Sequence, residues 1–189
     1  MAVTVQNPPI TAPEALKLLG ASSEQTSTGR RNRALIALLW RSGLRPGEAL
    51  ALTPRDIDLS ARSLTVADRV AGIDDLAAIE IGRWLDRRAE AGLADDGPFV
   101  STLQGKSLSQ AYVRELLPRL ASKAGLDGRV HAMGLRYACA AEMAGEGIAT
   151  EIIESQLGIR PQSSVARYLP IPDDADVISA MTARPVPRP

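Results

Sequence analysis

Apolar residues recur at every third or fourth position over most of this chain, the spacing that places them on one face of an α-helix. The densest apolar run, 34–40, predicts a buried helix that ends at Gly43. Pro46 suits the first turn of the next helix. Helices are expected at about 11–19, 34–40, 46–52, 74–91, 107–124, 134–144, 150–157, 164–169 and 173–183.

A strand pattern is clear only at 63–67, where polar and apolar residues alternate and place Leu64 and Val66 on one face. The polar run 20–29 is expected to form a loop. Many helices with one small sheet predict a mainly α fold with a small antiparallel β-sheet, of the α+β class.

The length of 189 residues predicts one domain, placed at 11–183 between a flexible N-terminus, 1–10, and a proline-rich tail, 184–189. Cys139 is the only cysteine and His131 the only histidine, which excludes a disulfide framework and a cysteine–histidine metal site. No metal and no cofactor is expected. The sequence has neither an apolar run of about 20 residues nor an export signal, so we expect no membrane association and a cytoplasmic location.

The formal net charge is zero, with 22 basic and 22 acidic residues, which argues against strong non-specific binding to polyanions. The charges are nevertheless segregated along the sequence. Every charged residue between Glu24 and Glu48 is an arginine, and 103–136 is mostly basic, whereas 68–96 is acidic. Such segregation suits a surface that faces phosphates, and solvated helix faces give the same pattern.

Four segments form one ordered set of motifs. They are RSGLRPGEALALTPRDIDLSARSLTV at 41–66, the helix that ends at Gly125, VHAMGLRYACAAEMAGEG at 130–147 and EIIESQLGIRPQSSVARYL at 151–169. In this order and spacing they resemble the catalytic domain of the tyrosine recombinases, the phage integrase family. The resemblance extends over about 11–183 and begins where the catalytic domain of that family begins. We therefore expect the N-terminal DNA-clamping domain of the family to be missing.

Cleavage of a DNA phosphodiester by a tyrosine hydroxyl needs an in-line nucleophile, fixed cations on the non-bridging oxygens, a general acid and a general base. Arginine suits the second task because its planar fork makes two parallel hydrogen bonds and its charge does not titrate. The resemblance implies that Arg45 and Arg136 bind the phosphate and that Tyr168 is the nucleophile. It also implies that Glu48 supports Arg45. We expect the two arginines to lie near Tyr168, with no carboxylate required between them.

Three of the six catalytic positions of the family carry different chemistry here. Met133 stands at the histidine of the His-x-x-Arg pair and Ile159 at the second histidine, and neither side chain transfers a proton. The family lysine lies on a β-hairpin, but here the strand runs almost straight into the next helix. Arg69 is the only basic residue left in that stretch, and its high pKa makes it a poor proton donor. His131 and Arg160 remain candidate auxiliary residues.

We therefore expect a degenerate tyrosine-recombinase-like protein, related to DNA integration and site-specific recombination, that binds double-stranded DNA weakly and cleaves it poorly or not at all. Two alternatives stay open. One is an active recombinase that forms a 3′-phosphotyrosyl DNA intermediate through Tyr168, and the other is a non-enzymatic interaction or regulatory partner of a recombinase.

The resemblance also implies a protein partner, because these enzymes exchange a C-terminal helix between subunits. Residues 173–183 are therefore expected to mediate self-association or association with an active recombinase. The segments 138–147 and 150–158 resemble a helix-turn-helix as well. The acidic start of the second segment argues against its entry into a DNA major groove.

Overall fold

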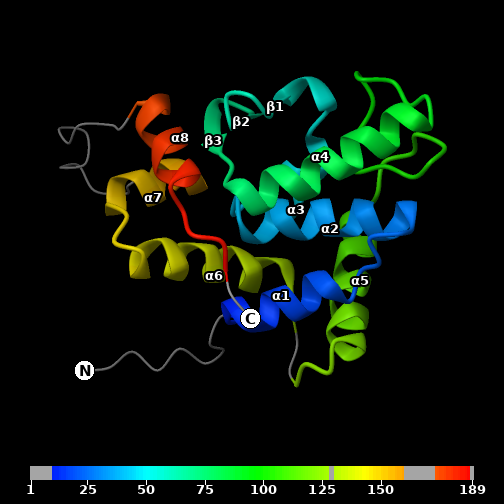
Figure 1. Ribbon diagram of the computed structural model, residues 1–189, viewed down its shortest axis with the longest axis horizontal. Coiled ribbons are helices and arrows are strands. Elements are labelled where there is room, and N and C mark those ends of the chain that lie inside the picture. The colour runs from blue at the N-terminus through cyan, green and yellow to red at the C-terminus, as the bar shows by residue number, and fades with distance from the viewer. Residues whose placement is uncertain (1–9, 128–129, 160–172, 188–189) are drawn as a thin grey trace.

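The fold is mainly helical, and the computed structural model describes residues 10–127, 130–159 and 173–187 (Figure 1). These residues form eight α-helices and one three-stranded sheet. The helices are α1 (Ala12–Gly20), α2 (Ser27–Trp40), α3 (Pro46–Ala51), α4 (Asp75–Glu90), α5 (Gln110–Lys123), α6 (Ala132–Gly145), α7 (Thr150–Leu157) and α8 (Asp174–Thr182).

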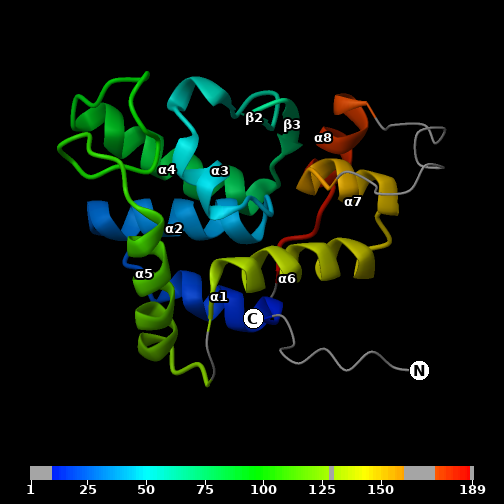
Figure 2. The ribbon, with the colours of Figure 1, turned by 180° about the vertical axis from the view of Figure 1, so that it is seen from behind.

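The α2 helix lies in the middle of the molecule. Figure 1 shows it between α4 on one side and α1 and α6 on the other, and Figure 2 shows the same order from behind. Every residue from 34 to 40 is buried, because neighbours cover this helix on all sides. The predicted apolar helix is therefore the centre of the core.

The sheet is antiparallel with the order β1-β2-β3, as the fold class predicts. Its strands are β1 (Ile57–Asp58), β2 (Ser63–Val66) and β3 (Arg69–Gly72). The prediction that the chain runs almost straight from the first strand into the next helix is wrong. Residues 67 and 68 form a tight turn, and Arg69 then pairs with Val66 across a complete hairpin.

Two predicted helix starts are also wrong, because side-chain caps override the apolar pattern. The α2 helix begins at Ser27, inside the predicted loop, since the Thr26 hydroxyl accepts a hydrogen bond from the Gly29 N–H. The α5 helix is capped by Ser109, whereas Ser107 pairs with Ser101 in an isolated β-bridge. The predicted helix at 164–169 lies outside the described residues.

The α8 helix packs on β3 and α7 and is followed by a segment that returns towards α2 (Figure 1). Gly72 of β3 permits this packing, because a Cβ there would lie 2.6 Å from the Cβ of Met181. Arg184, expected in a loose proline-rich tail, is buried. The C-terminal segment is thus part of the core on this side of the molecule.

Candidate functional site

Arg45 stands at the junction between the turn after α2 and the start of α3. Gly43 makes this turn with a φ of 65°, and Arg45 occupies the N-cap position of α3. The Glu48 carboxylate accepts hydrogen bonds from the Arg45 backbone N–H at 2.7 Å and from its guanidinium at 3.0 Å. The Arg45 side chain is 48% exposed, so it is held at its base while the guanidinium still reaches solvent.

Arg136 reaches the same place from α6 and is buried. Its two terminal nitrogens donate to the carbonyl oxygens of Gly43 and Leu157, each at 2.6 Å, which ties α6 to the turn after α2 and to the end of α7. One of these nitrogens lies 3.9 Å from the Glu48 carboxylate. Burial lowers the pKa of Arg136, the positive charge of Arg45 lowers it further, and Glu48 partly opposes both.

Arg69 is a third arginine at this position, and sequence reasoning did not select it as a site residue. It begins β3, and its guanidinium donates to Glu48 at 3.2 Å. Burial lowers its pKa, Glu48 opposes this effect, and Arg45 adds to it. The signal in the sequence is that Arg69 is the only basic residue between the strand predicted at 63–67 and the next helix.

Among the described residues the site therefore consists of three guanidiniums around the Glu48 carboxylate, and Asp68 also acts electrostatically on Arg69. Glu48 interacts with Arg45, Arg69 and Arg136, so a carboxylate lies between the two arginines that were expected to bind phosphate. Three cations therefore face two carboxylates, those of Glu48 and Asp68. The excess positive charge, partly desolvated, suits an anion with several acceptor oxygens, such as a phosphodiester.

The other predicted site residues are placed as follows. His131 is exposed and caps α6, where its Nδ1 atom accepts a hydrogen bond from the Gly134 N–H at 3.0 Å. Met133 lies on α6 one turn before Arg136, and Ile159 is exposed directly after α7. Tyr168 and Arg160 lie outside the described residues.

Comparison with known proteins decides the family. Residues 9–173 match the phage integrase family. The chain belongs to this family. The type 1 fimbriae regulatory protein FimE of Escherichia coli K12 is 32% identical over 152 residues, which cover 75% of this chain and 75% of FimE. The predicted relationship to the tyrosine recombinases is thereby confirmed.

Solved structures of the integrase family share the fold. The crystal structure of XerA recombinase matches 93% of this chain and 66% of XerA with a TM-score of 0.73 at 22% identity. A λ integrase tetramer bound to a Holliday junction matches 92% of this chain and 50% of its own length, with a TM-score of 0.62 at 20% identity. These similarities support the predicted fold class rather than a particular activity.

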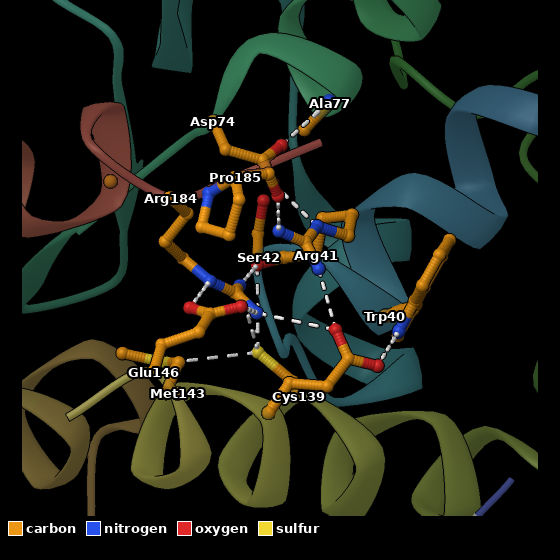
Figure 3. A network of polar contacts seen from close by, with 12 residues as sticks. Trp40, Arg41, Ser42, Asp74, Ala77, Cys139, Met143, Glu146, Arg184 and Pro185 are labelled. Carbon is orange, nitrogen blue, oxygen red and sulfur yellow. Dashed lines mark hydrogen bonds and ion pairs between the residues drawn. The ribbon is translucent and has the colours of Figure 1, made fainter. Parts of the chain in front are cut away.

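The described part of this integrase-family chain holds a second arginine cluster, which lies between α2, α6 and the C-terminal segment (Figure 3). Arg41 bonds to Asp74 at the start of α4 and to Glu142 of α6, whose other carboxylate oxygen accepts the Trp40 indole N–H. Arg184 enters from the C-terminal segment.

The Arg184 guanidinium completes this cluster, which we call the buried network. It donates to Glu146 at 2.7 Å, to Glu142 at 3.3 Å and to the Arg41 carbonyl oxygen at 3.0 Å (Figure 3). Two guanidiniums here meet three carboxylates, and both arginine side chains are fully buried. Each charge has partners inside the protein, so the network fastens the C-terminal segment to the core.

The described residues contain no group of three or more histidine, cysteine, aspartate or glutamate side chains that could hold a metal ion. In the same part of the chain, no helix is both long and apolar enough to cross a membrane.

Proposed function

We propose that this integrase-family protein binds double-stranded DNA through a backbone phosphate held by Arg45 and Arg136, and that it cleaves the strand poorly or not at all. The observation that carries the proposal is the convergence of guanidiniums on Glu48 with excess positive charge. The DNA-bound λ integrase structure, which shares the fold, supports DNA as the source of the phosphate.

The two arginines differ in burial, and this difference gives them different roles in binding a phosphate. Arg136 is fixed by two carbonyl oxygens, so its position does not change when an anion arrives, and little conformational entropy is lost. Arg45 is half-exposed, so its guanidinium is free to meet the non-bridging oxygens of a phosphate from the solvent side. Fixed donors of this kind stabilise negative charge on a phosphoryl group.

Impaired cleavage follows from the groups around these arginines. Met133 and Ile159 occupy the two histidine positions, and neither side chain donates or accepts a proton in the reaction. General acid and base groups each contribute typically about 10²- to 10⁴-fold to a rate. A tyrosine at position 168 would therefore attack a bound phosphate without effective help.

DNA binding is tested by fluorescence anisotropy with a short labelled duplex at several salt concentrations. We expect a dissociation constant of about micromolar or weaker at physiological salt. The double variant Arg45→Ala/Arg136→Ala should bind more weakly and lose about two units of the slope of log K against log salt, because each phosphate contact contributes about 0.9.

The matched control is Arg83→Ala/Arg87→Ala, which removes two arginines from α4, where both pair with glutamates on that helix. This control should retain the affinity and slope of the unaltered protein. Arg45→Ala alone is the variant that leaves the Arg136 bonds intact, and it should lose about half of the effect. Equal slopes in all four proteins would show that the arginine site is not the DNA contact.

A second candidate role is association through the C-terminal segment. The α8 helix buries Val177 and Met181 against β3 and α7, and Arg184 fills the buried network. A second copy of this chain or a related recombinase has a surface of the same chemistry. The C-terminal segment can therefore bind to that surface of a neighbouring subunit instead of its own. Analytical ultracentrifugation of the protein and of Arg184→Glu tests this, since repulsion from Glu146 should abolish any dimer.

A further inference from the structure

Arg31 is a buried arginine of α2 whose hydrogen-bond partners are neutral. Its Nη2 atom donates to the Tyr112 hydroxyl at 2.7 Å and to the Asn32 side-chain oxygen at 3.0 Å, and its Nε atom donates to the same oxygen at 3.3 Å. Only 6% of Arg31 is exposed, and its guanidinium lies 5.3 Å from the centre of the Tyr112 ring. Burial lowers the pKa of Arg31, and among the described residues Tyr112, rather than a carboxylate, opposes this shift.

The other buried arginines of the described residues have better compensation. Four of them form ion pairs with carboxylates: Arg33, Arg41, Arg136 and Arg184. Arg88 donates to three backbone carbonyl oxygens and to the Ser101 hydroxyl, and Asp95 opposes the effect of burial on its pKa. Arg31 has only one amide oxygen and one phenol as acceptors. A buried cation without a counter-charge is unfavourable, and a negatively charged ligand would account for it.

Two groups of the Arg31–Tyr112 pair are left to meet such a ligand. The Nη1 atom of Arg31 makes none of its hydrogen bonds to the described residues. The Tyr112 hydroxyl accepts a hydrogen bond from Arg31 and keeps its own proton to donate. Tyr112 is half-buried in the first turn of α5. An anion with several acceptor oxygens can accept from both groups at once.

The pair lies close to the arginine site, because the start of α5 contacts the start of α3. The α3 helix begins directly after Arg45, and a Cβ on Gly47 in its first turn would lie 3.3 Å from the Gln110 Nε2 atom of α5. Figure 2 shows α5 beginning beside α3. Double-stranded DNA carries one negative charge about every 1.7 Å along its axis, so a duplex held at Arg45 presents further phosphates to the neighbouring surface.

We propose that Arg31 and Tyr112 bind a second backbone phosphate of the DNA, separate from the phosphate at the arginine site. The inference rests on the proposed function, because a duplex bound at Arg45 and Arg136 is the source of this phosphate. Arg31 gains the negative charge that it lacks within the protein, and Tyr112 adds a hydrogen bond. Two separate phosphate contacts fix the orientation of a duplex on the protein, which one contact does not.

The test is fluorescence anisotropy with a labelled duplex over a series of salt concentrations. Arg31→Gln should lose about one unit of the slope of log K against log salt, because each phosphate contact contributes about 0.9. Arg31→Lys retains the positive charge and should retain the slope. Tyr112→Phe should bind the duplex more weakly with an unchanged slope, because the phenol carries no charge.

Arg30→Gln is the matched control. Arg30 precedes Arg31 on α2 and donates to the backbone carbonyl oxygen of Glu24, so the change removes the same formal charge without touching Tyr112. This variant should retain the affinity and the slope of the unaltered protein. If Arg31→Gln does not unfold cooperatively in urea, Tyr112→Phe replaces it in the test. An unchanged affinity in Tyr112→Phe would then overturn the inference.

The outcomes separate this inference from the proposed function. A loss of about one unit of slope in Arg31→Gln, with full slopes in Arg31→Lys and Arg30→Gln, supports the second phosphate contact. A full slope in Arg31→Gln, or an equal loss in Arg30→Gln or Arg31→Lys, would overturn it. The proposed function would still stand if Arg45→Ala/Arg136→Ala loses about two units. Equal slopes in all of these proteins would overturn both.

Discussion

The arginine site and the buried network use the same residue types for different purposes. In the site, three guanidiniums surround the carboxylate of Glu48, Asp68 acts electrostatically on Arg69, and Arg45 remains half-exposed. In the network, two guanidiniums meet three carboxylates, and Arg41 and Arg184 are fully buried (Figure 3). Arg41 and Arg45 are only four residues apart in the sequence.

Charge balance, rather than the presence of arginine, separates a binding site from a structural contact in this protein. In the network the two guanidiniums are matched by three carboxylates, so they carry no excess positive charge for a ligand to neutralise. A cluster with excess cations has uncompensated positive charge, which a bound phosphate can neutralise. The comparison predicts that the two clusters respond differently when single arginines are removed.

The largest effect is expected from Arg41→Ala. This change leaves Asp74 and Glu142 without their buried partner, so it should lower the free energy of unfolding by about 3–5 kcal/mol. Arg45→Ala removes a half-exposed arginine and should cost less than about 1 kcal/mol. Urea denaturation followed by circular dichroism measures both. Similar losses of unfolding free energy in the two variants would show that the arginine site and the buried network do not differ in charge balance as described.

Arg136→Ala should cost about 3 kcal/mol, although Arg136 belongs to the arginine site. The change deprives two carbonyl oxygens, those of Gly43 and Leu157, of charge-assisted hydrogen bonds of about 1.5–3 kcal/mol each. Arg136 thus combines a structural role with the proposed phosphate contact. A loss below about 1 kcal/mol in urea denaturation would contradict the structural half of this statement.

Arg184→Ala should cost about 2 kcal/mol, less than Arg41→Ala, because its partners Glu142 and Glu146 are partly exposed and water replaces some of the lost bonds. Arg87→Ala is the control, since its pairing with Glu90 on the surface of α4 contributes less than about 0.5 kcal/mol. The measurement is again urea denaturation. Equal losses would mean that the C-terminal segment is not fastened by Arg184.

The smallest effect concerns Cys139, which lies beside Arg41 and Arg184 in the network (Figure 3). Burial raises the pKa of this thiol to about 11, although the two arginines oppose the shift. Its pKa is thus higher in the folded than in the unfolded state, so its contribution is fully present below about pH 9 and is lost as the pH rises to about 11.

Between pH 8 and pH 10 this loss should be about 1 kcal/mol, because the unfolded chain ionises first. Cys139→Ala should lose correspondingly less stability over the same interval in parallel urea titrations. A thiol that reacts readily with an alkylating reagent at pH 7.5 in the native protein would show that the network does not keep Cys139 buried from water.

Local patterns in the sequence were sufficient for much of the fold. The apolar run at 34–40 identifies the central helix, and the alternation at 63–67 identifies one strand. The start of α2 at Ser27 was missed because a single hydroxyl cap outweighs a polar composition. The third strand was missed because a two-residue turn leaves little polar sequence between the strands.

Residues of the site could be predicted from the sequence only where they stand in a recognisable motif. Arg45, Glu48 and Arg136 stand in recognisable motifs, and the structure brings them together. Arg69 meets them only because the hairpin folds back on α3, a contact between residues far apart in the sequence. Arg184 contacts Arg41 and Glu146 over still longer separations, which no local pattern encodes.

The central claim is that the site holds a DNA phosphate without cleaving the strand efficiently. Its most direct test is incubation of the purified protein with a nicked suicide duplex, followed by denaturing electrophoresis to detect a covalent protein–DNA adduct. We expect no adduct above the level of Tyr168→Phe, because Met133 and Ile159 supply neither acid nor base. A substantial adduct that Tyr168→Phe abolishes would contradict it and identify an active recombinase.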